Sequence, residues 1–207
     1  MRLEPWLTGR RRLVLAVLTG ALAALGQAPW HLQGMTVVAL AGLVVLVIRA
    51  GSVKGAFWTG LAAGTGHFAL ALSWIVEPFL IDVARHGWMA PFAVIFLSSG
   101  LGLFWAVAAA LAVRARHPAL AFAVAFTALE WLRGVILTGF PWAMVGHVWI
   151  GSPVDQLAAV LGPSGLTLLT LLAAALPVAL RWRGLALSAV LLAGAAGILA
   201  VVTLWPP

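Results

Sequence analysis

The feature that most constrains this chain is a series of long apolar stretches separated by short breaks that carry most of its charges. A helix needs about 20 apolar residues to cross a bilayer, within a range of about 17–25. Most of the stretches reach this length, but the first two are short and fit either tilted spans or the two arms of a re-entrant hairpin. The seven stretches lie near residues 13–26, 35–48, 55–76, 91–113, 119–137, 165–180 and 184–204.

The composition supports a lipid environment. Apolar residues without Gly form 64% of the 207 residues, and charged residues only 8%. With the 22 Gly included, the apolar share is roughly three quarters, against about 45–50% in soluble domains. A soluble enzyme, a nucleic-acid-binding module and a disordered segment are therefore excluded. Unpaired backbone groups are too costly in hydrocarbon, so we predict one all-α domain over residues 1–207, a polytopic membrane helix bundle of about seven transmembrane segments.

The basic residues alternate between the two sides of such a bundle. If every stretch crosses the membrane, ten of the 12 Lys and Arg residues fall on one side, and only Arg85 and Arg133 fall elsewhere. Lys and Arg are retained on the cytoplasmic side during insertion. The pattern therefore predicts a multi-pass membrane protein with its N-terminus on the cytoplasmic side and its C-terminus on the opposite side.

Two charges inside the fifth stretch are the first candidates for a polar site. Glu130 and Arg133 lie three residues apart, hence on one face of a helix. Each alone would cost roughly 2.5–3.5 kcal/mol near the centre of a membrane helix. Two interpretations remain open: an ion pair that fixes the start of the next loop, or a polar site for a lipid headgroup or acyl ester.

The break after this stretch, residues 138–164, is the longest in the chain. Its prolines disfavour a continuous helix, yet it is too apolar for a freely solvated loop. We therefore expect an outer loop that dips partly into the membrane. A hydrolase built from Ser152 or Ser164 with His147 and Asp155 is disfavoured, because the Gly-x-Ser-x-Gly pattern is absent.

Helix packing is the expected role of the small and polar residues in the third stretch. Gly60 and Gly64 form a GxxxG pattern that lets helices approach closely, and His67 is expected to be a satisfied core residue. No other histidine or carboxylate stands beside His67 at metal-ligand spacing, and the chain has no Cys. We expect neither a metal nor a cofactor.

The sequence resembles a known family over nearly its whole length. The most specific part is residues 130–142, EWLRGVILTGFPW, followed by Gly146 and by LAAVLGPSGL at residues 157–166. Further matches are QAPW at residues 27–30 and LSWI at residues 72–75. These residues resemble the membrane domain of bacterial apolipoprotein N-acyltransferases.

The resemblance implies an activity and its substrates. Members of the family lie in the bacterial inner membrane with a cytoplasmic N-terminus, which implies a periplasmic C-terminus for this chain. They transfer an acyl chain from a membrane phospholipid to the N-terminal diacylglyceryl-cysteine of a lipoprotein. The transfer passes through a thioester on a cysteine of a periplasmic nitrilase-like domain. By match of motif, a substrate-binding floor is expected beneath that domain, formed by Glu130, Arg133, Phe140, Pro141 and Trp142.

The chain departs from the family in the catalytic part. It has no Cys and, with 207 residues, no length for the nitrilase-like domain. We therefore expect a fragment of a longer enzyme, with no catalytic residue of its own and inactive alone, acting with phospholipid, the lipoprotein and the missing domain. The alternatives are a small multispan transporter and a membrane anchor module. The sequence leaves open acyl-chain preference, oligomeric state and the reason why the chain ends at Pro207.

Overall fold

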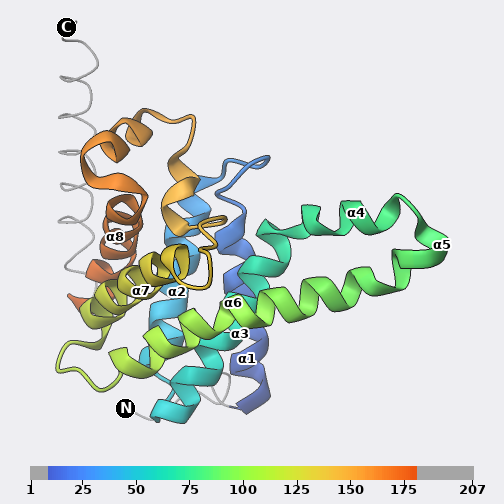
Figure 1. Cartoon of the computed structure of the whole chain (residues 1–207). Coiled ribbons are helices and arrows are strands. Elements are labelled where there is room, and N and C mark those ends of the chain that lie inside the picture. The colour runs from blue at the N-terminus through green and yellow to red at the C-terminus, as the bar shows by residue number, and fades with distance from the viewer. Residues whose placement is uncertain (1–8, 181–207) are drawn as a thin grey trace, which may run out of the picture.

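The computed structural model describes residues 9–180, and within this range the chain forms helices and loops without a strand. The prediction of an all-α helix bundle is confirmed, whereas the seventh predicted stretch, 184–204, lies outside the described residues (Figure 1). The long helices are α1 (Gly9–Ala24), α2 (Gln33–Ile48), α3 (Val53–Ala71), α6 (Ala90–Ala112), α7 (Pro118–Val135) and α8 (Ala158–Ala179).

Several described helices are long and apolar enough to cross a membrane. Three qualify directly: Val83–Ala112, Pro118–Val135 and Pro153–Ala179. A fourth span is possible if α3 is counted together with Ser73–Leu80, although the chain bends by 65° between them. Helix α2 is apolar but shorter. With these helices and its apolar composition, the chain is a membrane protein.

Short helices connect the long ones. Between α3 and α6 the chain forms η2 (Ser73–Val76), α4 (Glu77–Leu80), α5 (Val83–His86) and η3 (Gly87–Met89), and none of their residues is buried. We call residues 73–96 the arm, because they project sideways from the bundle (Figure 1). Between α7 and α8 lie η4 (Val145–Trp149) and η5 (Pro153–Leu157).

Two element boundaries differ from those expected. The third stretch was expected to run to residue 76, but α3 ends at Ala71 and the chain continues in a new direction. The last described helix begins at Ala158 instead of residue 165. It is interrupted at Gly162, where φ is 66° and ψ is 175°, a conformation that glycine adopts readily and other residues rarely do. Pro163 then follows as the first residue of the second half, where proline is tolerated.

Glycines bring the central helices into backbone contact. A methyl group on Gly60 would lie 2.5 Å from the carbonyl oxygen of Trp105, and one on Gly64 would lie 2.6 Å from the Cα of Gly102. Helix α3 therefore packs directly on the backbone of α6. On its other side, a methyl on Gly66 would overlap the carbonyl oxygen of Val17 in α1. The packing role expected for Gly60 and Gly64 is what the structure shows.

Aromatic rings fill the space between α3, α6 and α7. Trp105 is buried, with its ring centroid 4.6 Å from that of Phe126 and 4.8 Å from that of His67. Phe68 lies edge-on to Trp105, and Phe122 to Phe126. This cluster gives the centre of the bundle a fixed core on which the ends of the helices are positioned.

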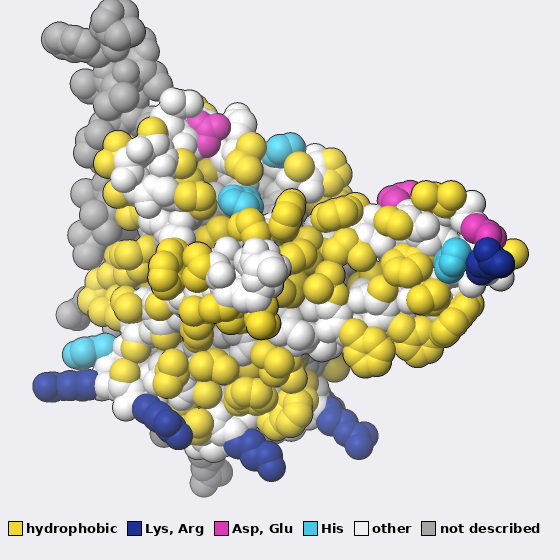
Figure 2. Space-filling model, viewed as in Figure 1, with side chains coloured by type: hydrophobic (Ala, Val, Ile, Leu, Met, Phe, Trp, Pro, Cys, Tyr) yellow, Lys and Arg dark blue, Asp and Glu magenta, His cyan; other side chains and the backbone are white. Residues whose placement is uncertain are grey.

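Most of the described basic side chains gather at one end of the bundle (Figure 2), apart from Arg85 in the arm and the buried Arg133. Figure 2 shows Lys and Arg along the lower edge, with a broad hydrophobic band above them. Arg12, near the start of α1, donates a hydrogen bond of 3.1 Å to the carbonyl oxygen of Ala50 in the α2–α3 turn, which ties two of the basic breaks together. The loop between α7 and α8 lies at the opposite end (Figure 1).

Candidate functional site

The predicted pair of charges lies at the end of α7, where both side chains are buried. The side chains of Glu130 and Arg133 are each 1% exposed, and Arg133 Nη2 lies 3.7 Å from Glu130 Oε1. The guanidinium also lies 5.0 Å from the ring centroid of Phe68. A cation over an aromatic face in a dry environment is favoured by the ring quadrupole. The pair is thus built into the protein interior rather than facing lipid.

Arg133 holds the first part of the following loop. Its Nη1 donates hydrogen bonds to two backbone carbonyl oxygens, those of Phe140 and Trp142, the latter at 2.9 Å. Hydrogen bonds from a charged donor are stronger than those between neutral groups. One guanidinium therefore fixes the backbone on both sides of Pro141.

Glu130 holds the next part of the same loop. Its Oε1 accepts a hydrogen bond of 3.0 Å from the backbone N–H of Val145. Its Oε2 accepts one of 2.7 Å from the hydroxyl of Thr167 in α8, and the oxygen of that hydroxyl accepts one of 2.9 Å from the backbone N–H of Gly146. The carboxylate therefore joins α7, the loop and α8.

Two more side chains complete the set. His67 Nε2 in α3 lies 3.2 Å from the carbonyl oxygen of Ala143, which accepts a hydrogen bond from the ring when Nε2 carries the proton. Gln27, in the α1–α2 connection, donates a hydrogen bond of 3.3 Å to the carbonyl oxygen of Met144. Residues 140–146, which we call the clamped segment, are thus held by side chains from four different parts of the chain.

The backbone around the clamped segment adopts a conformation that needs this support. Leu137, Thr138 and Ala143 have φ of 51°, 75° and 56°, in the left-handed region that non-glycine residues rarely enter. Each such residue costs roughly 1–3 kcal/mol and persists only where its surroundings impose it. Strained backbone of this kind concentrates at functional sites. The hydrogen bonds to the clamped segment therefore maintain a backbone conformation that a free loop would not keep.

The remaining predicted site residues are more exposed than the two charges. Trp142 is 54% exposed, Pro141 is exposed and Phe140 is half-buried. The ring centroids of Phe140 and Trp142 are 5.3 Å apart. The five predicted residues therefore lie together, with the two charged side chains buried, Phe140 half-buried against the core, and Pro141 and Trp142 exposed.

A cavity of about 300 Å³ opens beside Trp142. Its apolar lining includes Trp74, at the start of the arm, and Ile150 after η4. Polar side chains at its wall are Gln27, His31 and His147. The cavity thus combines aromatic surface with a few polar groups, as binding sites for amphipathic ligands do.

Burial of His147 makes the stability of the protein depend on pH. Burial lowers the pKa of His147 below its usual value, and the charge of Arg133 lowers it further. The unfolded chain then takes up a proton near pH 6.5 that the folded protein resists, so stability falls as the pH drops below about 6.5. We expect His147→Gln to reduce this loss between pH 7 and pH 5, measured as the shift in melting temperature in detergent. An unchanged pH dependence would contradict this expectation.

Sequence reasoning missed the residues that reach the clamped segment from other helices. Thr167 was not singled out, although α8 is apolar apart from Ser164, Thr167 and Thr170, and a buried threonine hydroxyl needs a hydrogen-bond partner. His67 was expected to be a satisfied core residue. It is buried and its Nε2 lies within hydrogen-bond distance of Ala143, but its Nδ1 is buried without a hydrogen-bond partner among the described residues, and its role as a support for the loop was not foreseen. Gln27 appeared only as part of the QAPW match.

Comparison with known proteins gives the family. The family model for the apolipoprotein N-acyltransferase N-terminal domain matches residues 19–176. The apolipoprotein N-acyltransferase from Caulobacter vibrioides is 47% identical to this chain over 82% of the chain. The one from Rhizobium rhizogenes is 36% identical over 84% of the chain. The relative from Ralstonia nicotianae is 34% identical over 93% of the chain.

These alignments cover the chain far more completely than they cover the relatives. The matches account for 33%, 36% and 38% of the three proteins, so the chain spans about a third of the length of the curated relatives it matches. The matched model covers most of the described residues, including the ion pair and the clamped segment. The chain therefore belongs to the apolipoprotein N-acyltransferase family, within which it corresponds to the N-terminal domain.

Proposed function

We propose that this chain is the membrane-embedded part of an enzyme that transfers an acyl chain from a phospholipid to the N-terminal diacylglyceryl-cysteine of lipoproteins. The names of the relatives support the activity, and their much greater length supports a catalytic domain elsewhere in the enzyme. In this proposal its partners are membrane phospholipids, the diacylglyceryl-lipoprotein and a periplasmic nitrilase-like domain. No described feature favours a transporter or a simple anchor over this role.

The clamped segment carries the proposal. It presents Phe140, Pro141 and Trp142 on a backbone that four parts of the chain hold in place, beside a cavity with aromatic and polar walls. Because this surface is already held in place, it loses little conformational entropy when a substrate binds. It is therefore suited to positioning acyl chains. Trp142 and Phe140 are proposed to contact the acyl chains.

Glu130 and Arg133 are proposed to act through the loop. The sequence left open whether they bind lipid or fix the loop, and their contacts favour the second role. Both side chains are buried, and Arg133 donates to loop carbonyl oxygens rather than facing the cavity. They are thus positioning residues, whose loss would move the aromatic surface away from the reacting groups.

The proposed orientation places the N-terminus in the cytoplasm and the C-terminus in the periplasm of a bacterial inner membrane. The gathering of Lys and Arg at one end of the bundle supports this, because such residues stay on the cytoplasmic side (Figure 2). The clamped segment then lies on the periplasmic side.

A chimera tests the proposed function directly. This chain would replace the matching N-terminal third of the Caulobacter vibrioides relative, and acylation would be measured as the mass increase of a diacylated lipoprotein. We expect the chimera to acylate. Arg133→Ala should lower the rate by about 100-fold, as small displacements of positioning groups do, and Trp142→Ala by about tenfold.

The controls separate a local effect from a general one. Trp58→Ala removes an exposed tryptophan at the basic end of α3, far from the clamped segment, and should leave the rate unchanged. A chimera that inserts into the membrane but does not acylate would overturn the proposed function. Full activity of Arg133→Ala would overturn only the role given to the ion pair.

A further inference from the structure

The arm has a surface that the bundle does not use. Its elements α4 and α5 pack on one another and on η2 and η3, and η2 and η3 pack on α6. Large apolar side chains of the arm nevertheless remain exposed: Ile81 is 88% exposed and Phe96 is 72% exposed. A surface of this kind is not stable in water and requires an apolar partner.

The geometry of α3 places the arm at the level of the membrane interface. The 19 residues of α3 are about 28 Å long, close to the roughly 30 Å of the hydrocarbon layer. They begin beside Lys54 at the basic end, so Ala71 lies near the opposite interface. The chain then bends by 65°, and the eight residues of η2 and α4 rise only about 5 Å further if α3 follows the bilayer normal.

The length of the helix that runs from the tip of the arm back into the bundle also places the arm at the membrane interface. Val83–Ala112 has 30 residues and is about 45 Å long, so fitting it into the hydrocarbon layer would need a tilt beyond the usual range of about 0–40°. The excess length belongs to the arm. Its charges lie toward the tip and the upper side, and apolar side chains cover its lower side, which faces the basic end (Figure 2). This distribution is that of a segment lying in an interface.

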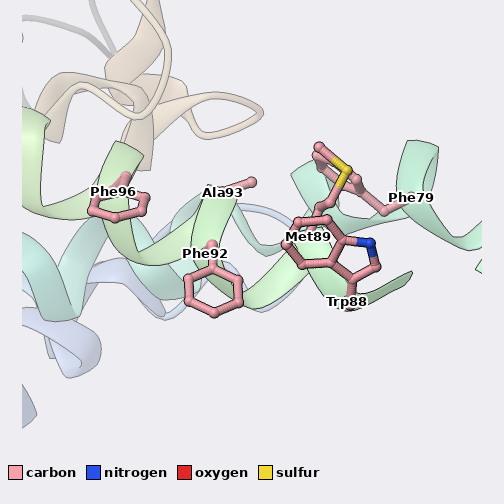
Figure 3. A pocket seen from close by; sticks show the side chains of 6 residues that line it. All are labelled: Phe79, Trp88, Met89, Phe92, Ala93 and Phe96. Carbon is pink, nitrogen blue, oxygen red and sulfur yellow. The ribbon is translucent and has the colours of Figure 1, made fainter. Parts of the chain in front are cut away.

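The arm also carries an open apolar cavity. The cavity has a volume of about 390 Å³ and lies between α4, η3 and the first turns of α6 (Figure 3). Trp88 and Phe92 form an edge-to-face pair in its wall, with ring centroids 6.2 Å apart. The side chains that line it are Phe79, Trp88, Met89, Phe92, Ala93 and Phe96.

We propose that the arm lies in the outer leaflet and that this cavity holds one acyl chain of a phospholipid. Its wall offers no polar partner, so a headgroup gains nothing there, and at this depth the surrounding apolar molecules are lipid tails. Trp74 belongs to the start of the arm and also lines the cavity beside Trp142. The arm thus leads from the surrounding lipid to the clamped segment, and its role as the entry for the acyl donor rests on the proposed function.

The absence of cysteine from the chain allows a clean test of depth. Single nitroxide labels would be placed with I81C and F96C in the arm and studied in phosphatidylethanolamine–phosphatidylglycerol vesicles. V38C, on the exposed face of α2, serves as the reference in lipid, and A115C, in the exposed turn between α6 and α7, serves as the reference in water. We expect the arm labels to be accessible to oxygen, like V38C. Accessibility to a water-soluble nickel complex, like that of A115C, would overturn the proposal.

A second measurement tests the acyl chain itself. A phosphatidylethanolamine with a photoreactive tail would be crosslinked to the chain, and the labelled peptides mapped. We expect crosslinks within residues 73–96, and the variant A93W, which fills the cavity, should lose most of them. V107W, on the exposed face of the same helix, is the matched control and should keep them. Equal crosslinking of the arm in A93W and V107W would overturn the cavity as the binding site.

The two proposals fail in different ways. If the arm binds the tail but A93W in the chimera acylates normally, the arm is a lipid site without a role in donor supply. If the chimera does not acylate while the arm still crosslinks, the proposed function fails and the lipid site stands.

Discussion

Gly66→Ala is expected to lower the free energy of unfolding of this protein by about 3 kcal/mol or more, at the upper end of the range for overpacked sites. The added methyl would overlap the backbone carbonyl oxygen of Val17, so α1 and α3 would have to move apart along their length. A carbonyl in the middle of a helix cannot rotate away as a side chain can. The measurement is chemical unfolding in detergent micelles, followed by circular dichroism.

The same chain offers a matched control for this substitution. A methyl on Gly100, in α6, would meet nothing within 4 Å. Gly100→Ala should therefore be neutral, or stabilising by about 0.5–1 kcal/mol, because alanine loses less backbone entropy than glycine in a helix. Equal stabilities of the two variants would show that the close approach of α1 and α3 is not required.

Glu130→Ala is the second substitution with a large expected effect. It leaves the buried guanidinium of Arg133 without its opposite charge, and it leaves Val145 and Thr167 without their acceptor. Removing one partner of a buried pair costs about 3–5 kcal/mol, because the remaining charge stays buried. We expect a loss of this size, measured in the same unfolding experiment.

A double substitution distinguishes the pair from its separate contacts. Glu130→Ala with Arg133→Ala should cost less than the sum of the two single losses, because no charge is left unpaired. Glu77→Ala, which removes an exposed carboxylate of the arm, is the control and should change stability little. Additive losses at residues 130 and 133 would mean that the two side chains are not coupled.

The sequence predicts the architecture well because the bilayer imposes it. Hydrocarbon excludes unpaired backbone groups, so an apolar stretch of sufficient length has one outcome, and the all-α bundle follows without knowledge of any contact. The bend after Ala71 could not be predicted in this way. It depends on how the arm packs against α6, and the sequence around Leu72 continues the apolar pattern with no proline at the bend.

The site was predictable in part, and for a similar reason. The spacing of Glu130 and Arg133 places both on one helical face, so their pairing follows from local geometry. Thr167 reaches the same carboxylate from 37 residues away. Such a contact depends on the relative placement of α7 and α8, which no local pattern contains. The sequence therefore names the charges but not the groups that the charges hold.

The spacing of the ion pair also bears on how the protein enters the membrane. Glu130 and Arg133 are on the same helix, so their charges can compensate one another before any other helix has arrived. Because the two charges compensate one another, the free energy of inserting this helix into the membrane is lower than that of a helix with a lone charge. Helix α8 follows later in the chain, and the hydroxyl of its Thr167 then adds a hydrogen bond to Glu130, which is already paired with Arg133.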